Sequence, residues 1–335
     1  MPNRIAKPLA VSILLASAVA LAHAQTVKGT IALPNLPEQV AANPFTNRVY
    51  VAVPNFGALP YDYLTVINGY KDTVITNIQI PTVAYAVAVD PFRDIVYVGG
   101  AILEADGSIS GSEVVAISGR TNKIVRTIPV TSTTTGNGIQ GLAVRWETGT
   151  LYAANGSDDE VDVIRGFKVQ ARIPVGDAPF GVAVNQFTGT VYASLSTLGG
   201  VALVDPKTDT VTTTTPFGTS GAGIAVDQVK GSVFTTNSVA SPAVGQVGVL
   251  GETGNLLATI PVGQNPLGID VDSFTHLAFV ANPGDDDASV IDGTTNTVKT
   301  TVPVSSLFLA ANPFTHKVYI APADPVPSLT VMTEK

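Results

Sequence analysis

The residues of this sequence that could do chemistry are mostly carboxylates in turns. Two runs, Asp285-Asp286-Asp287 and Asp158-Asp159-Glu160, offer enough oxygen atoms to hold a hard cation. Neither run has the spacing of a known calcium loop, so ordinary solvated loops remain the alternative. The candidate metal residues are Asp285, Asp286 and Asp287, and the cation that they would hold is Ca²⁺ or another divalent ion.

Nucleophilic and thiol chemistry find little support. The chain has no Cys, which excludes disulfides, thiolate metal sites and thiol nucleophiles. Beyond residue 24 the only histidines are His276 and His316, which occupy equivalent turns, and no G-x-S-x-G elbow accompanies them. No residue is therefore singled out as catalytic, and the sequence favours a protein that is not an enzyme.

The first 24 residues have the pattern of a signal peptide. Arg4 and Lys7 precede an apolar run from Leu9 to Leu21, and an A-x-A site follows at Ala22 to Ala24. The run is too short to cross a bilayer as a helix. We therefore expect a cleaved leader over 1–24, a single domain over 25–335, and a periplasmic or extracellular protein that does not insert into the membrane.

The rest of the chain repeats one unit, and residues 269–304 are its clearest copy. Four short runs with alternating apolar residues are separated by turns rich in Asp, Asn, Gly and Pro. Four antiparallel strands in so few residues form a sheet that cannot bury its own faces. Such a unit must stack on copies of itself, as the blades of a β-propeller do.

The number of copies predicts an all-β, seven-bladed propeller of four-stranded antiparallel blades. First strands are expected at seven places: Val40, Val87, Leu142, Val182, Ile224, Ile269 and Leu309. An aromatic residue follows each of them by ten positions, and Phe45, Phe92, Phe187, Phe274 and Phe314 recur in the first turn. We expect both sets to pack in the core, because recurrence at one position indicates packing between blades.

The two ends of the chain are expected to complete one blade. Thr26 to Pro34 resembles a fourth strand, whereas the chain ends after Ser328 to Met332, which resembles a third. The N-terminal strand should therefore close the ring beside the C-terminal blade. Closure removes the open sheet edges that favour aggregation.

Several short runs carry a resemblance to a known family. They include YVA at Tyr50, VIN at Val66, VAN at Val280, VID at Val290 and TIPVG at Thr259. With these runs, residues 26–333 resemble the YVTN repeats of bacterial and archaeal β-propellers, a group that includes YncE-like proteins. The resemblance implies an extracytoplasmic seven-bladed propeller and supplies no reaction, because a fold does not determine function.

Propeller topology predicts which loops share a face. The loops between second and third strands, and between blades, should lie on a top face that is acidic and therefore unsuited to nucleic acid. Aromatic residues outside the repeat positions fall in the same loops, where they could either bind a partner or plug the channel. The candidate partner-binding residues are Phe56, Tyr61, Tyr63, Tyr85, Glu104, Asp106, Phe180 and Phe308.

One position inside the expected channel breaks the repeat. The middle residue of the first strand is Ala in six copies and Asp270 in the sixth blade. A carboxylate there requires water, a donor or a cation. The candidate channel residues are Glu38, Gln140 and Asp270.

Two functions remain open. The first is a non-catalytic binding or scaffold protein that holds a protein, peptide or glycan on its top face. The alternative is a metal-assisted lyase or lactonase with its site at the channel mouth. The shortage of histidines on the top face favours the first.

Overall fold

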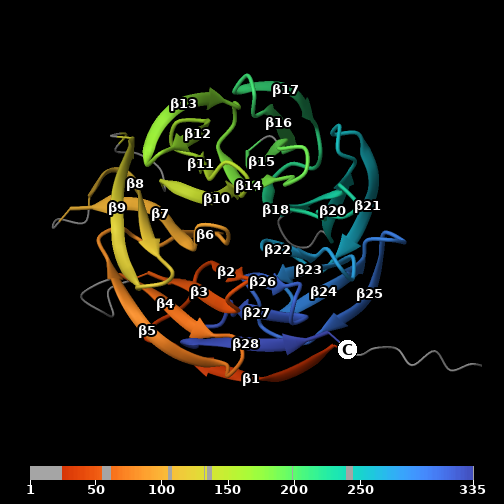
Figure 1. The fold of residues 1–335 in the computed structure, drawn as a ribbon. Helices are drawn as coiled ribbons and strands as arrows, with labels where there is room; N and C mark the ends of the chain where they lie inside the picture. Colours follow the sequence, from red (N-terminus) through yellow and green to blue (C-terminus); the bar gives the residue numbers. More distant parts are fainter. Residues whose placement is uncertain are drawn as a thin grey trace, which may run out of the picture.

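The chain folds into a ring of β-sheets (Figure 1). The computed structural model describes residues 25–54, 62–104, 108–131, 133, 138–197, 199–238 and 244–334. Within these ranges the strands form seven four-stranded antiparallel sheets around a central axis, which is the predicted seven-bladed propeller. No helix capable of crossing a membrane occurs in the described ranges.

Each blade is a meander whose first strand lies next to the axis and whose fourth strand lies outermost (Figure 1). Blades 1 to 3 consist of β2 (Val40–Asn43), β3 (Arg48–Val53), β4 (Asp62–Asn68) and β5 (Thr73–Ile80); β6 (Ala86–Asp90), β7 (Ile95–Leu103), β8 (Ile109–Ser118) and β9 (Lys123–Thr131); and β10 (Ile139–Arg145), β11 (Thr150–Asn155), β12 (Glu160–Arg165) and β13 (Lys168–Pro174).

The remaining blades repeat this order, with the first strand of each again facing the axis. Blades 4 to 7 consist of β14 (Pro179–Val184), β15 (Val191–Leu195), β16 (Val201–Asp205) and β17 (Thr210–Thr215); β18 (Gly221–Val226), β19 (Val233–Asn237), β20 (Gly245–Leu250) and β21 (Leu256–Val262); β22 (Ile269–Asp272), β23 (Leu277–Asn282), β24 (Asp287–Asp292) and β25 (Thr297–Val302); and β26 (Phe308–Asn312), β27 (Lys317–Ala321), β28 (Ser328–Thr333) and β1 (Thr26–Ala32).

The last blade confirms the predicted closure. The sheet order is β1-β28-β27-β26, and β1 pairs antiparallel with β28 from Thr26 opposite Thr333 to Ala32 opposite Ser328. In Figure 1 the red β1 lies on the outer rim against the blue β28. The first residues of the domain therefore complete the sheet that the last residues begin.

The core lies between neighbouring blades, and the second-strand aromatics occupy it as predicted. Tyr50, Tyr192 and Tyr319 are fully buried, as are the phenylalanines at the same position in blades 5 and 6. Each packs among Val, Ile and Leu side chains of the next sheet. Burial of a large aromatic ring contributes about 1.5–3 kcal/mol, so this layer is a main source of stability.

The prediction for the first-turn phenylalanines was wrong. The side chains of Phe45, Phe92, Phe187, Phe274 and Phe314 are 50% to 78% exposed. Their turns project beyond the ends of the sheets, where the neighbours are equivalent turns of adjacent blades instead of the apolar face of a sheet. A recurring aromatic position therefore indicates a buried packing contact in the second strands, whereas in the first turns it indicates an exposed side chain.

We call the side with the strand 1–2 and strand 3–4 turns the bottom face, and the opposite side the top face. In blade 1, for example, the turns after β2 and β4 lie at the bottom, and the loop between β3 and β4 lies at the top. Because β1 runs upward beside β28, Thr26 lies at the bottom and Ala32 at the top.

Removal of residues 25–34 should destabilise the whole ring. The deletion takes away the fourth strand of blade 7, including the buried Ile31 and Leu33, and exposes the edge of β28. We expect the melting temperature to fall by about 10 °C or more, since loss of two buried aliphatic side chains and a row of backbone hydrogen bonds costs several kcal/mol. Differential scanning calorimetry tests this, and an unchanged melting temperature would contradict a closed ring.

Candidate functional site

A central channel runs along the axis, lined by the first strands of all seven blades. Its cavity has a volume of about 330 Å³. Pro44, Trp146 and Pro313 line its bottom end, and Phe180 and Phe308 line its top end. Most of its wall consists of Val, Ala, Ile and Gly residues, so the wall itself offers few groups for chemistry.

Two of the predicted partner-binding aromatics close the top of this channel. Phe180 in β14 and Phe308 in β26 stack across the axis, with ring centroids 6.4 Å apart and planes 11° apart. Their blades, 4 and 7, lie on opposite sides of the ring (Figure 1). Leu267 and Leu307 join the same apolar cluster. This stacking across the axis favours the plug role over partner binding, and both roles stay predictions.

The carboxylate of Asp270 bridges the first strands of blades 6 and 7. Its two oxygens accept hydrogen bonds from the backbone N–H groups of Val271 (2.8 Å) and Ala311 (2.9 Å). Burial raises the pKa of Asp270 to about 6, while the two hydrogen bonds act in the opposite direction. The carboxylate therefore accepts hydrogen bonds from backbone N–H groups of the strands beside the channel. The Ala at this position in the other blades has no acceptor with which to do so.

Asp270→Asn should remove a fall in stability that the parent shows as the pH rises from about 4 to 6. The folded-state pKa of about 6 exceeds the usual value of 3.8, so the folded state holds a proton that the unfolded state has lost. Stability therefore falls as the pH rises from about 4 to 6 and stays low above that range. The variant has no carboxyl group to titrate, so it lacks this slope. Its amide replaces only one of the two acceptor oxygens and turns a donor toward the other backbone N–H, so we predict loss of the slope and not a gain in stability.

Urea denaturation at several pH values measures this effect. A variant that keeps the parent's fall in stability between pH 4 and 6 would contradict the assignment of this slope to Asp270. A Ca²⁺-dependent rise in the melting temperature that the variant loses would indicate a bound cation.

At the top of blades 1 and 2, Glu38, Asp62 and Tyr85 lie close together. Burial raises the pKa of Tyr85, and the charges of Glu38 and Asp62 raise it further, so both carboxylates act electrostatically on its hydroxyl. Burial also raises the pKa of Glu38 to about 7. Nearby, Gln39 donates to the backbone oxygen of Gln140 (2.8 Å), which ties blade 1 to blade 3.

The other predicted top-face residues have varied places. Tyr63 is partly buried and packs against the core between blades 7 and 1, whereas Glu104 is exposed at the end of β7. Phe56, Tyr61 and Asp106 lie outside the described residues. Of the predicted partner-binding residues in these loops, the structure thus describes Tyr63, Tyr85 and Glu104. We call these three, together with the predicted channel residue Glu38, the top-face corner.

The three predicted metal residues turn toward separate protein donors. Each carboxylate accepts a hydrogen bond from a different residue: Asp285 from the backbone N–H of Gln264 (2.8 Å), Asp286 from the Ser305 hydroxyl (3.4 Å) and Asp287 from the Asn282 side chain (2.7 Å). In the described ranges they do not form a group whose ligand atoms converge on one point. A divalent ion at this run stays a prediction.

The second acidic run is balanced by one arginine. Arg172 lies 3.2 Å from Glu160 and 3.3 Å from Asp162, and Asn155 donates to both Asp158 and Asp162. Burial raises the pKa of Glu160 to about 7. This cluster is a polar network within blade 3, in which the positive charge of Arg172 offsets part of the negative charge of Glu160 and Asp162.

The bottom face carries a hydrogen bond that recurs between blades. Each contact joins two neighbouring blades. The residue at the end of the first strand in one blade bonds to a turn residue in the next blade, which lies just before the second strand of that next blade. Four such contacts join Asn43 to Asp94, Asp227 to His276, Asp272 to His316 and Asn312 to Asn47, at 2.7 to 3.1 Å. The four turn residues have φ between 49° and 58°, a region that favours Asn, Asp and Gly. We call these contacts the interblade latch.

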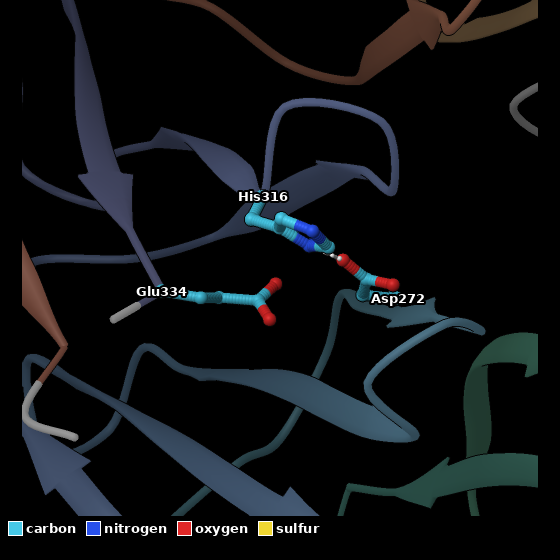
Figure 2. Close-up of side chains that lie close together, drawn as sticks. All are labelled: Asp272, His316 and Glu334. Atoms are coloured by element: carbon cyan, nitrogen blue, oxygen red, sulfur yellow. Dashed lines mark hydrogen bonds and ion pairs between the residues drawn. The ribbon is translucent and has the colours of Figure 1, made fainter.

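One latch gains a third acidic group. Figure 2 shows Glu334 pointing toward the Asp272–His316 pair, and the ligand atoms of all three lie within 4.8 Å of one another. Burial raises the pKa of Glu334 to about 7. Such a triad could in principle bind a metal. However, the latch at Asp227 and His276 has the same geometry, so interblade contact is sufficient reason for the Asp–His pair.

His316→Asn should preserve stability, because Asn47 fills the same place in blade 1. His316→Leu should lower the free energy of unfolding by about 1–3 kcal/mol, since it loses the hydrogen bond and places a bulky residue at positive φ. Urea denaturation with and without Zn²⁺ measures both effects. A Zn²⁺-dependent stabilisation of the parent that His316→Asn abolishes would identify a metal site instead of a latch.

Sequence reasoning missed two features of the bottom face. It placed the first-turn phenylalanines in the core, although their position among turn residues was a signal of exposure. It also placed His276 and His316 at the turn position of Asn47 and Asp94 without anticipating that each contacts the preceding blade. The latch pairs lie 44 to 49 residues apart for the histidines, one blade length, and only the ring brings them together.

Comparisons with known proteins support the fold alone. No family model and no curated protein sequence matches the chain. Among solved structures, a chain of Kuenenia stuttgartiensis hydrazine synthase is similar, with a TM-score of 0.72, 16% sequence identity, and coverage of 89% of this chain and 95% of that chain. At this identity the likeness extends to the propeller architecture and not to an activity.

Proposed function

We propose that this propeller is a non-catalytic binding or scaffold protein that holds a protein, peptide or glycan on its top face. The supporting observation is Glu38, a half-buried carboxylate whose pKa burial raises to about 7, grouped with Asp62 and Tyr85. A partner that offers a cation or hydroxyl donors would relieve the cost of this buried acid. An adjacent aromatic hydroxyl adds the mixed polar and apolar character typical of binding sites.

The channel offers weaker support for an enzyme. Asp270 is the only ionisable residue among the described residues that line it, and both of its oxygens already accept backbone hydrogen bonds. Phe180 and Phe308 close the end nearest the acidic loops. A metal-assisted lyase or lactonase would need several ligands converging on an open mouth, so this alternative is the less favoured.

We infer two further properties from the sequence. The short motifs favour membership of the YVTN-repeat, YncE-like group of propellers. The pattern of residues 1–24 favours a cleaved signal peptide and a location in the periplasm or outside the cell. N-terminal sequencing of the protein from a cell envelope fraction would test the second directly.

Glu38→Gln combined with Tyr85→Ala should weaken partner capture by about tenfold, since residues at the centre of a contact commonly contribute more than 1 kcal/mol each. Immobilised parent and variant are compared for capture from cell envelope extracts and on glycan arrays. The matched control is Tyr70→Ala, which changes a bottom-face residue that is 74% exposed.

The expected pattern is loss of capture in the Glu38 and Tyr85 variant and full capture in the Tyr70 variant. Equal capture by all three proteins would reject the top-face corner.

A further inference from the structure

We propose that the bottom face docks onto an anionic lipid surface, with a ring of exposed aromatic residues entering the headgroup region. This is a second site, separate from the top-face corner proposed above. It is carried by the placement of exposed apolar side chains, by the distribution of charge, and by the position of the N-terminal strand.

The first observation is the ring of first-turn side chains, which we call the crown. Six blades present an apolar residue two positions after the Asn or Asp at the end of the first strand, and blade 3 presents Trp146 beside the same place. The crown consists of Phe45, Phe92, Trp146, Phe187, Val229, Phe274 and Phe314. All seven surround the bottom end of the channel.

The crown is rigid and uniform in height. In six blades the backbone N–H of the crown residue donates to the Asn or Asp side chain two positions earlier, so the same turn recurs. Aromatic contacts then run from Trp146 through Phe92, Phe45 and Phe314 to Phe274, with centroids 5.5 to 6.0 Å apart. Equivalent positions on a closed ring lie in one plane, which suits a flat surface.

A second set of apolar residues surrounds the crown at the outer rim. Val74, Ile124, Leu256 and neighbouring residues lie at the bottom ends of the outermost strands and are 36% to 54% exposed. Among the large hydrophobic side chains exposed in the described ranges, only Leu103, Val244 and Val326 lie at the top. Exposed apolar area is therefore concentrated on one face of the molecule, far beyond the scattered residues of an ordinary surface.

Basic and acidic residues are also distributed unequally between the bottom and top faces. The bottom turns hold the exposed bases Lys71, Arg93, Arg120, Lys123, Lys168, Lys207 and Lys230, against the exposed acids Glu147 and Glu252. Among the less exposed acids, Asp72 contacts Lys317, Asp209 contacts Arg165 and Asp90 contacts Arg93, whereas Asp205 and Asp292 accept backbone hydrogen bonds within their turns. Exposed bases still outnumber exposed acids at the bottom. The described top loops carry acids and no lysine or arginine. An anionic bilayer would therefore attract the bottom face and repel the top.

The N-terminal strand leaves the ring at this face. Thr26 pairs with Thr333 at the bottom end of blade 7, so β1 enters its sheet from this face. Aromatic side chains and basic residues together are the combination that binds bilayer interfaces.

A second copy of the chain fits the same face less well. Two rings packed bottom to bottom would bring the exposed bases of one copy against those of the other, which like-charge repulsion disfavours. The rim residues also lie at the outer circumference, where a flat lipid surface reaches them all at once. Charge complementarity thus selects the anionic surface.

The test measures co-sedimentation of the full chain with vesicles of phosphatidylcholine, with and without phosphatidylglycerol. Parent protein is compared with Phe92→Ser/Phe187→Ser, which alters two highly exposed crown residues, and with Val244→Ser/Val326→Ser, a matched top-face control. A third variant, Lys71→Gln/Lys207→Gln, removes two rim charges. Near-ultraviolet circular dichroism confirms that each variant is folded, and light scattering gives its oligomeric state.

We expect binding that requires phosphatidylglycerol, weakens by about tenfold or more in the crown and lysine variants, and is unchanged in the top-face control. Binding that is equal in parent and crown variant would overturn the proposal, including the case in which residues 1–24 alone carry it. A parent dimer that the crown variant dissociates, without any vesicle binding, would also overturn it and would identify a second copy as the occupant. Neither result bears on the top-face corner, which the Glu38 and Tyr85 variant tests separately.

Discussion

The contact between neighbouring blades is the constraint on which the whole structure depends. A four-stranded sheet of this size has two apolar faces and no means of covering either, so each blade is stable only when the next one packs against it. The side chains of Tyr50, Tyr192 and Tyr319 form the middle of these contacts and are fully buried. The pairing of β1 with β28 extends the same contact to the last blade, and every other feature takes its position from the closed ring.

Closure also explains why groups distant in sequence lie together. Phe180 and Phe308 stack across the axis although more than a hundred residues separate them, and the Asn312–Asn47 latch joins the last blade to the first. At the four junctions that have it, the interblade latch ties a bottom turn to the preceding blade. Because the turns share one hydrogen-bonding pattern, the phenylalanines that they carry end in one plane.

Much of the fold could be predicted because strand periodicity and turn residues recur seven times. The number of blades, the buried second-strand aromatics and the closing strand all follow from that recurrence. The environment of Phe45 and its equivalents could not be obtained in this way, because a repeat shows that a position is equivalent in each blade without showing whether it faces a sheet or solvent. Likewise, Asp270 stood out as an exception, but one of its two donors, the backbone N–H of Ala311, comes from the next blade, so its role needed the three-dimensional ring.

The resulting molecule has two chemically different faces joined by a channel with little reactive chemistry. The top combines acidic loops with the buried carboxylate of Glu38, and the bottom combines the crown with exposed bases. A binding protein with this polarity could hold a partner on one face while the other face rests on a surface. The rigidity of the ring would keep the two sites in a constant relation.

Hydrogen exchange of the full chain, measured by mass spectrometry with and without phosphatidylglycerol vesicles, tests this two-faced account most directly. The account predicts slower exchange in the first turns of the blades, around Phe45, Phe92, Phe274 and Phe314, with no change in the acidic top loops. Slower exchange confined to the top loops, or no change on either face, would contradict it.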